Sequence, residues 1–380
     1  MRCLFLINGL GLGNSTRCHA VIEHLAAGGW EVHVLTSGNG LSYFEGRDSI
    51  ASLSSMASFF YSGTGTGISG WSTLKTVGAL ATRVKAKRQR LESLLDTIRP
   101  DIAVSDSEYA LSPLRRRRIP IIGLNTSEIV VSEYLRNRQR ADGTRTHFWF
   151  VEYLDYLFHR CFCDRVLSPF PLRTPTRHRK FQRIGLIVRR AVQEIALQTG
   201  RKESPSPRQL HRVVFMLSGS VHASQIPFDR YDLPFKIDVV GRSGEARRNL
   251  TFHGRQMNNV DLLAGADALV INGGYSALSE AFALRKRTFV IPVVGHAEQF
   301  VNACLARDLG LGFIATETNV LDQLLEMHRQ DRWVELKPLP ARLEIDGARE
   351  AAQAIAAFCP DKAGAKRLKQ NPLTAERARV

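Results

Sequence analysis

The sequence predicts an α/β protein built from two Rossmann-like, doubly wound domains that face each other across a cleft. Two observations carry this prediction. Short apolar runs alternate along the chain with patterns of helical period, which is the order of a parallel sheet covered by helices. A glycine-containing turn follows the first strand of each half, at residues 9–13 and 218–220, and such turns hold phosphates at helix N-termini. The length of 380 residues suits two domains of this size.

Composition supports a globular protein in a reducing compartment. Hydrophobic residues make up 44% of the chain and charged residues 23%, which are ordinary globular values. No apolar run reaches the length of a transmembrane helix, and the opening nine residues are typical of a first strand rather than of a secretory signal. The closest two of the six cysteines, Cys161 and Cys163, have no partner pair at zinc spacing. Free buried thiols and a cytoplasmic location are therefore expected.

Positive charge is concentrated in the first half of the chain. The net charge is +16, and residues 1–190 hold 27 Lys and Arg against 15 Asp and Glu. Residues 191–360 hold 19 of each, and the last twenty residues hold 6 against 2. A basic surface attracts nucleic acid, anionic lipid or an anionic substrate. The alternative is a solvated surface that only keeps the protein in solution.

The first half begins with a βαβ unit. The sequence predicts a strand over residues 2–8, a glycine-rich turn, a helix capped by Ser15 that ends near residue 28, and a strand over 31–36. The turn GLGLGNSTR is not a dinucleotide fingerprint, because Ser15 and Thr16 stand where the third glycine is expected. Dinucleotide binding at this turn is therefore not favoured.

The rest of the first half is predicted from similar signals. The expected elements are a mobile loop over 52–71, a basic helix over 74–98 that Arg99-Pro100 stops, and strands over 101–105 and 120–124. The strand over 101–105 delivers Asp106 and Glu108 to its carboxyl end, where open α/β sheets bind ligands. An aromatic run over 147–162 either packs in the core or contacts a membrane.

The second half repeats the alternation of strands and helices. Residues 201–209 are predicted to form a surface loop. The sequence predicts five strands, one that starts at residue 212 and four over 235–240, 249–252, 268–271 and 288–292. It also predicts helices over 260–264, from about Ser276 onward, and over 341–358. The basic residues after 358 are expected to be disordered.

The stretch from residue 267 to 302 organises the chain. Its strand, Gly273-Gly274 turn and helix would present backbone N–H groups and the positive end of a helix dipole to a phosphate. Glu280 follows one turn later and can accept hydrogen bonds from a pair of sugar hydroxyls, while Gln299 offers both donor and acceptor groups to a second sugar. These features indicate a nucleotide-sugar site. The alternative is a tight turn followed by a solvated glutamate.

This stretch resembles the donor site of GT-B glycosyltransferases, in particular the family 28-like group of the peptidoglycan lipid-linked N-acetylglucosaminyltransferase and the glycolipid synthases. The resemblance covers most of residues 1–358 and rests on Gly273-Gly274, Ser276, Glu280, Pro292, Glu298-Gln299 and Asn302. It implies that the helix N-terminus holds the diphosphate, Glu280 the ribose and Gln299 the donor sugar, and that Arg189 reaches the phosphate. The donor-binding residues expected in full are Arg189, Ser218, Gly219, Ser220, His253, Gly273, Gly274, Tyr275, Ser276, Glu280, His296, Glu298 and Gln299.

The resemblance also implies that different parts of the chain have different roles. An acceptor-binding domain is expected over residues 1–188, a nucleotide-sugar-binding domain over 189–340, a closing helix over 341–358 and a basic tail over 359–380. Within the first turn, Gly11, Gly13 and Arg17 would line the acceptor side.

The catalytic base is the main departure from the family pattern. Asn14 occupies the position of the histidine that is a common candidate for the base, and an asparagine side chain cannot take up a proton at neutral pH. The sequence leaves Asp106 as the preferred candidate, ahead of Glu108 and His19. A base positioned in this way typically accelerates transfer 10²–10⁴-fold.

The expected activity is transfer of a sugar from a UDP-sugar or another nucleotide sugar to a hydroxyl or amine of a lipid-linked, glycan or small-molecule acceptor. The resemblance implies inversion at the anomeric carbon with no cofactor and no obligatory metal. Two alternatives stay open: a nucleotide-sugar hydrolase or epimerase of the same fold, and a basic nucleic-acid-binding protein, for which no helix-turn-helix, zinc or RNP pattern is present. The expected location is the cytoplasm, or the inner face of the cell membrane as a peripheral protein.

Overall fold

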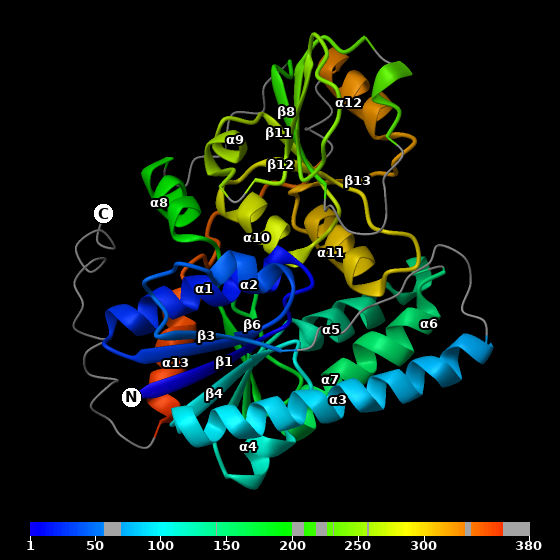
Figure 1. The fold of residues 1–380 in the computed structure, drawn as a ribbon. Coiled ribbons are helices and arrows are strands. Elements are labelled where there is room, and N and C mark those ends of the chain that lie inside the picture. Colours follow the sequence, from blue (N-terminus) through cyan, green and yellow to red (C-terminus); the bar gives the residue numbers. More distant parts are fainter. Residues whose placement is uncertain are drawn as a thin grey trace. The chain divides into compact units, whose positions relative to one another are not determined.

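The computed structural model describes residues 1–56, 70–141, 143–199, 209–217, 226–230, 232–256, 258–330 and 336–359. The chain forms two compact units, each built around its own parallel sheet (Figure 1). The first unit comprises Met1–Thr126, Tyr156–Ile187 and the chain from Asp346, and the second comprises Ser127–Asp155 and Val188–Ile345. The prediction of an α/β protein with two doubly wound sheets is confirmed.

The first unit contains a seven-stranded parallel sheet in the order β3-β2-β1-β4-β5-β6-β7. Its strands are β1 (Arg2–Ile7), β2 (Glu31–Thr36), β3 (Ser52–Ser55), β4 (Ile102–Asp106), β5 (Ile121–Leu124), β6 (Arg165–Pro169) and β7 (Phe181–Ile184). The order reverses between β1 and β4, and Phe5 of β1 lies between Val34 and Val104 of its neighbours. The buried apolar strands β1, β2, β4 and β5 are those that the sequence predicts, whereas β6 and β7 are not predicted from it.

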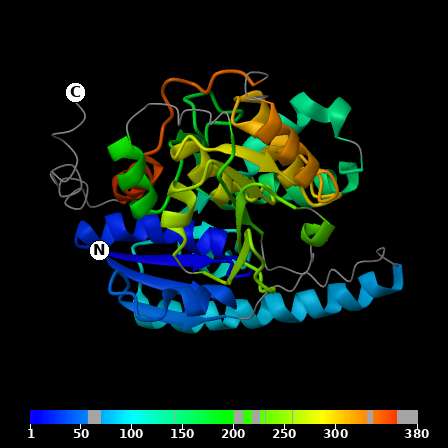
Figure 2. The ribbon, with the colours of Figure 1, turned by 90° about the horizontal axis from the view of Figure 1, so that it is seen from above.

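Helices cover both faces of this sheet. They are α1 (Leu12–Ala27), α2 (Asn39–Phe44), α3 (Gly70–Ile98), α4 (Ser112–Arg116), most of α7 (Tyr153–Phe162) and α13 (Gly347–Phe358). Figure 2 shows α3 as the long pale-blue helix. Helices α1 and α13 pack together on one face, where Val21, Ile22, Ala352 and Ile355 join the core formed by β1, β2 and β4.

Three expectations for the first unit are wrong in detail. Helix α1 begins directly after Gly11, so Ser15 lies buried inside the helix and does not cap it. Residues 52–55 form an edge strand rather than a loop, because their backbone pairs with β2 although their serine-rich sequence has no apolar alternation. The closing helix starts at Gly347 rather than 341, at a point where a Cβ would lie 1.8 Å from the carbonyl oxygen of Gly185.

The second unit contains a six-stranded parallel sheet in the order β10-β9-β8-β11-β12-β13. Its strands are β8 (Arg212–Met216), β9 (Lys236–Val240), β10 (Leu250–Gly254), β11 (Ala268–Ile271), β12 (Arg287–Val290) and β13 (Gly312–Ile314). Its core includes Phe215, Ile237, Val270, Phe289 and Leu324. The five strands predicted from the sequence are all present.

The helices of the second unit come from two separate parts of the chain. They are α5 (Ser127–Asn137), η1 (Arg138–Arg140), α6 (Arg145–His147), the π-helix η2 (Phe148–Glu152), α8 (Arg190–Thr199), η3 (Phe228–Arg230), α9 (Val260–Ala264), α10 (Tyr275–Ala283), α11 (Ala297–Asp308) and α12 (Val320–Arg329). Helix α5 packs against α11. Residues 127–155, which the predicted division assigns to the N-terminal domain, therefore belong to the same compact unit as the predicted donor site.

The aromatic run over 147–162 is partly buried and partly exposed. Phe148 is buried and stacks on Tyr134, with 3.7 Å between the ring centroids. Trp149, Phe150 and Leu154, in contrast, are 47%, 71% and 52% exposed. Core packing therefore explains only part of the run. No described helix is both long enough and apolar enough to cross a membrane.

Candidate functional site

The predicted phosphate turn lies between β11 and α10. Gly273 has a φ of 74°, a conformation that favours glycine, and a Cβ there would approach the carbonyl oxygen of Gln299 to 3.2 Å. The fully buried Asn302 donates from Nδ2 to the Gly273 carbonyl at 2.8 Å. This bond ties the turn to α11 and gives a structural reason for the Asn302 of the motif.

The N-terminus of α10 has no side-chain cap. Its N-cap residue is Gly274, which supplies no capping side chain, and the first turn contains no acidic residue. The first N–H groups of a helix have no partner within the helix, so they attract a phosphate together with the helix dipole. Tyr275 and Ser276, both predicted donor-binding residues, form this first turn.

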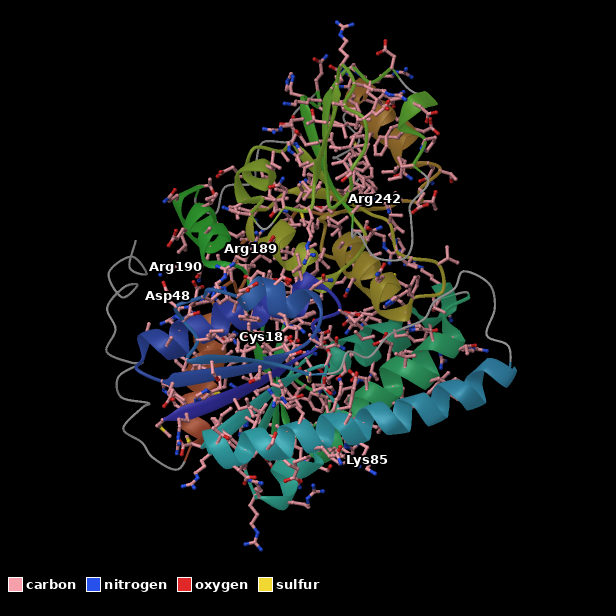
Figure 3. All side chains as sticks on the ribbon, viewed as in Figure 1. Cys18, Asp48, Lys85, Arg189, Arg190 and Arg242 are labelled. Carbon is pink, nitrogen blue, oxygen red and sulfur yellow. The ribbon has the colours of Figure 1, made fainter. Side chains whose placement is uncertain are left out.

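Glu280 and Arg189 lie together in the second unit, as the prediction of a shared site requires, but they bind each other. Arg189 Nε donates to Glu280 Oε1 at 2.6 Å and Arg189 Nη2 donates to Glu280 Oε2 at 2.8 Å. Arg189 Nη2 also donates to Asn259 Oδ1 at 2.7 Å. Arg189 is labelled in Figure 3, directly before α8. Each oxygen of a carboxylate has two acceptor sites, so Glu280 can still accept from sugar hydroxyls while it is paired.

The remaining predicted donor residues are His296, the N-cap of α11, and Glu298 and Gln299, which lie in its first turn rather than in a loop. His296 is the N-cap of α11 and its Nδ1 accepts from the Gln299 N–H at 3.5 Å. Gln299 Oε1 in turn accepts from the Val293 N–H at 2.9 Å. The side-chain oxygen of Gln299 therefore holds the loop in shape. Its role toward a donor sugar stays a prediction.

His253, one of the expected donor-binding residues, is held by a buried carboxylate. His253 Nε2 lies 2.6 Å from Asp238 Oδ1, and Arg212 Nε donates to Asp238 Oδ2 at 2.7 Å. Burial acts to raise the pKa of Asp238, but the hydrogen bonds from Arg212 and His253 outweigh it and the pKa is lowered. The other predicted turn of this unit, Ser218, Gly219 and Ser220, lies outside the described residues.

In the first unit, three predicted residues meet at the first turn. Arg17 donates to both oxygens of Asp106, at 2.9 and 2.6 Å, and Arg17 Nη2 donates to Asn14 Oδ1 at 3.3 Å. Asp106 is fully buried, and the Cys18 thiol donates to it at 3.2 Å. Burial, and then the charge of Asp106, raise the pKa of the Cys18 thiol. Because it is fully buried and bonded to both Arg17 and Cys18, Asp106 does not present its carboxylate to an acceptor in this conformation, and its role as base stays a prediction.

Glu108 and His19, the other candidates for the base, are also held by neighbours. Lys87 Nζ donates to both oxygens of Glu108, at 3.0 and 2.7 Å, and both side chains are buried. Burial lowers the pKa of Lys87 although Glu108 acts to raise it. His19 contacts the Tyr43 hydroxyl and Ser49 Oγ, each at 3.2 Å. Burial, and then Arg47, lower the pKa of His19 to about 4.

The two acceptor-side glycines have different settings. Gly11 is the N-cap of α1, and a Cβ there would meet no atom within 4 Å. The Gly13 carbonyl accepts from Thr16 Oγ1 at 3.0 Å within the first turn of α1. These contacts do not show whether either glycine touches an acceptor, so this role stays a prediction.

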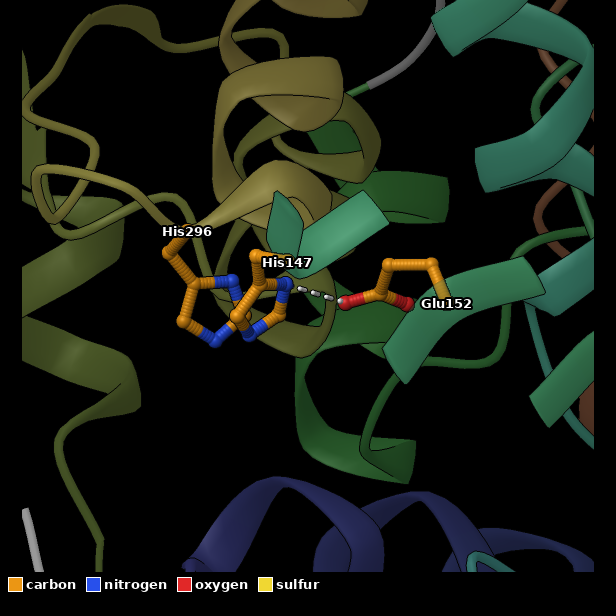
Figure 4. Close-up of side chains that lie close together, drawn as sticks. All are labelled: His147, Glu152 and His296. Carbon is orange, nitrogen blue, oxygen red and sulfur yellow. Dashed lines mark ion pairs between the residues drawn. The ribbon is translucent and has the colours of Figure 1, made fainter. Parts of the chain in front are cut away.

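Two residues that the sequence analysis did not single out lie beside the donor loop. His147 Nδ1 is 3.4 Å from Glu152 Oε1, and the His147 and His296 ring centroids are 4.6 Å apart (Figure 4). Burial, and then His296, lower the pKa of His147 to about 4. Burial, followed by Glu298 and Asp155, raises the pKa of Glu152 well above its ordinary value. No sequence spacing links positions 147 and 296, so only the fold reveals this cluster.

Comparison with known proteins finds a matching family and a relative. The model of glycosyl transferase family 1 matches residues 1–328. A protein of Methanosarcina acetivorans, described as an uncharacterised glycosyltransferase, is 22% identical over 340 residues, which cover 82% of this chain and 83% of the relative.

Solved glycosyltransferase structures share the fold. The MurG structure from Acinetobacter baumannii has a TM-score of 0.57 at 14% identity and covers 94% of this chain and 99% of its own. SnogD from Streptomyces nogalater has a TM-score of 0.54 at 17% identity, with 97% and 95% covered. SsfS6 from Streptomyces sp. SF2575, complexed with thymidine diphosphate, has a TM-score of 0.55 at 17% identity, with 94% and 96% covered.

Proposed function

The chain belongs to glycosyl transferase family 1, and from that premise we propose that it transfers a sugar from a nucleoside diphosphate sugar, with UDP as the preferred nucleotide, to a hydroxyl or amine acceptor. It is a glycosyltransferase of the GT-B fold. The observation that carries the proposed donor is the combination, within one compact unit, of the uncapped α10 N-terminus with Glu280 and Arg189. The thymidine diphosphate bound by SsfS6 supports a nucleoside diphosphate as the common part of the donor.

The proposed donor pose follows from these contacts. The diphosphate binds the first N–H groups of α10, which are contributed by Tyr275 and Ser276. The ribose hydroxyls donate to Glu280, and the guanidinium of Arg189 lies within bonding distance of Glu280, on the phosphate side of the ribose. The donor sugar then reaches the loop that Gln299 holds, beside His296 and Glu298.

The proposed reaction is an inverting displacement at the anomeric carbon. The acceptor oxygen or nitrogen forms a bond to that carbon while the bond to the diphosphate oxygen breaks, and the electron pair leaves with the nucleotide. The α10 N-terminus and Arg189 stabilise the charge that develops on the diphosphate, so the transfer needs no metal there. The acceptor proton passes to a base, for which Asp106 is the proposed group once its pairing with Arg17 opens.

The proposed acceptor is lipid-linked, and the proposed location is the cytoplasmic face of a membrane. The excess of Lys and Arg over residues 1–190 provides positive charge for an anionic surface. Trp149, Phe150 and Leu154 are exposed apolar side chains within ten residues of chain. Aromatic residues of this kind are favoured where membrane and water meet.

Calorimetry with UDP-sugars and TDP-sugars tests the donor proposal. Glu280→Ala should weaken donor binding at least tenfold, because each hydrogen bond to a carboxylate contributes roughly 1.5–3 kcal/mol. Glu245→Ala, which removes an exposed carboxylate of the same unit, is the matched control and should bind as the wild type does. Equal affinities for all three proteins would contradict the proposed ribose contact. Release of UDP without any acceptor would instead identify a hydrolase.

A further inference from the structure

Three side chains that could bind a metal converge where the segment of α6 and η2 meets the start of α11. His147, Glu152 and His296 each offer one ligand atom, and these atoms lie within 4.8 Å of one another. Figure 4 shows the two imidazole rings side by side, with the Glu152 carboxylate next to His147. All three residues belong to the second compact unit. Among the described residues, this is the one group of three or more such side chains with metal-ligand spacing.

The distance between the ligand atoms of His147 and Glu152 suits a small metal ion. Ligands bound to tetrahedral zinc at about 2.0–2.2 Å are roughly 3.3–3.6 Å apart, and His147 Nδ1 lies 3.4 Å from Glu152 Oε1. His147 Nδ1 is buried, and among the described residues it has no hydrogen-bond partner despite this nearby oxygen. The nitrogen and the oxygen thus approach each other as two ligands of one ion would. The ligand atom of His296 lies within 4.8 Å of both, so a small shift of its ring would bring three ligands around one ion.

The electrostatic surroundings also favour a cation. Besides its pairing with His147, the Glu152 carboxylate is acted on by the charges of two further carboxylates, Glu298 and Asp155. Glu152 itself is 7% exposed, and a buried carboxylate is costly unless it is paired or coordinates a metal. A divalent ion would supply the opposite charge and use the imidazole lone pairs at the same time.

We propose that His147, Glu152 and His296 form a binding site for a divalent transition metal ion, with zinc as the expected occupant. Two imidazoles and one carboxylate are a known zinc ligand set. Magnesium and calcium prefer oxygen ligands. The ion would join η2 to the first turn of α11, which carries Gln299, and so fix that turn. This role is separate from the diphosphate, and the site stands whether or not the proposed transfer is correct.

Metal titration of the full-length protein tests the site directly. After treatment with a chelator, the protein is titrated with Zn²⁺ by calorimetry and with Co²⁺ by visible absorption. One ion per chain is expected, with a Co²⁺ band of a tetrahedral site that Zn²⁺ displaces, and with a Zn²⁺-dependent rise in Tm. Mg²⁺ at the same concentration should produce neither heat nor a Tm shift. Equal binding of Mg²⁺ would overturn the assignment to a transition metal.

Substitutions show which residues hold the ion. His147→Ala and His296→Ala should each weaken Zn²⁺ binding at least tenfold, since even the loss of an outer-shell partner costs 10–100-fold. Glu152→Gln keeps the size of the side chain and should have the same effect. His211→Ala, which removes an exposed histidine of the same unit, should leave Zn²⁺ binding unchanged. Far-ultraviolet circular dichroism confirms that each variant is folded. The absence of stoichiometric binding, or equal binding by folded variants and wild type, would refute the site.

Discussion

At the scale of single residues, the buried ion pair of Arg17 and Asp106 is the main feature of the first turn of the chain. The sequence places both residues at the carboxyl edge of the sheet and suggests a base. The structure shows two charge-assisted bonds between them and full burial of the carboxylate. Removing one partner of a buried ion pair leaves the other charge uncompensated. The pair therefore contributes to stability whatever its part in the chemistry.

The first prediction concerns this pair. Asp106→Asn should lower the free energy of unfolding by up to about 3–5 kcal/mol, because Arg17 loses its buried countercharge. Denaturant unfolding of this variant, of Arg17→Gln and of the double variant forms a cycle in which the double variant should lose less stability than the sum of the two single variants. Unchanged stability together with a hundredfold fall in kcat and normal donor affinity would instead assign Asp106 to proton transfer alone.

His19 provides a prediction about pH. Its pKa in the folded protein is about 4, whereas an unfolded histidine has a pKa of about 6.5. Below pH 6.5 the unfolded chain therefore takes up a proton that folded His19 does not, so His19 makes stability fall as the pH drops from about 6.5 to about 4. The loss from this group is at most about 3 kcal/mol.

Urea unfolding across this pH range checks the effect. His19→Gln removes the titrating group, so the difference in unfolding free energy between variant and wild type should change steadily between pH 6.5 and 4 and stay constant above pH 7. His211→Gln, at an exposed histidine, is the control and should leave the pH dependence of stability unchanged. A difference that does not depend on pH would show that the buried imidazole is not the cause.

At the scale of elements, the strand–turn–helix that ends in α10 was predictable because each part has a local signal. The strand over 268–271 is apolar throughout, the turn has two glycines, and the helix has its glutamate one turn inside. The edge strand at 52–55 was not predictable, because its stability comes from backbone pairing with β2 rather than from its own residues. The same applies to the start of α13, which depends on the close approach of Gly347 to Gly185.

The residues of the candidate site also fall into two groups, those that the sequence predicts and those that it does not. Glu280 and Gln299 follow from their spacing to the glycine turn, but their partners do not. The pairing of Glu280 with Arg189 spans 91 residues, and the meeting of His147 with His296 joins distant parts of the chain. Contacts between distant segments depend on how helices pack, and one sequence contains no local signal for that packing. The sequence therefore predicts which elements bind the donor but not what holds the binding residues in place.

Asn302 offers a prediction at this scale, because it joins α11 to the turn before α10. Asn302→Ala removes the donor to the Gly273 carbonyl and leaves that buried oxygen without this bond. The variant should lose about 1–3 kcal/mol of unfolding free energy, and it should bind a nucleoside diphosphate more weakly because the turn is less constrained. Thermal unfolding and calorimetry with UDP measure the two effects. Loss of stability with unchanged UDP affinity would separate the turn from the donor site.

At the scale of the whole molecule, the distribution of charge and the exposed aromatic side chains bear on the acceptor. The excess of Lys and Arg over Asp and Glu is in residues 1–190 and in the last twenty residues, while residues 191–360 hold equal numbers of the two. A donor site needs only local positive charge, so an excess spread over half the chain calls for another explanation. Attraction to an anionic surface is one that basic residues and exposed apolar residues support together.

Sedimentation with lipid vesicles tests this explanation. The protein should pellet with anionic vesicles at low salt and much less at high salt, since each basic residue near the surface contributes about 1 kcal/mol that salt screens. Phe150→Ser should reduce the bound fraction at every salt concentration, because it removes a 71% exposed aromatic ring from the proposed contact. Leu197→Ser, which removes an apolar side chain that is 61% exposed on α8, should leave the fraction unchanged. Equal recovery in the supernatant with neutral and anionic vesicles would argue against a lipid-linked acceptor and would favour a glycan or small-molecule acceptor instead.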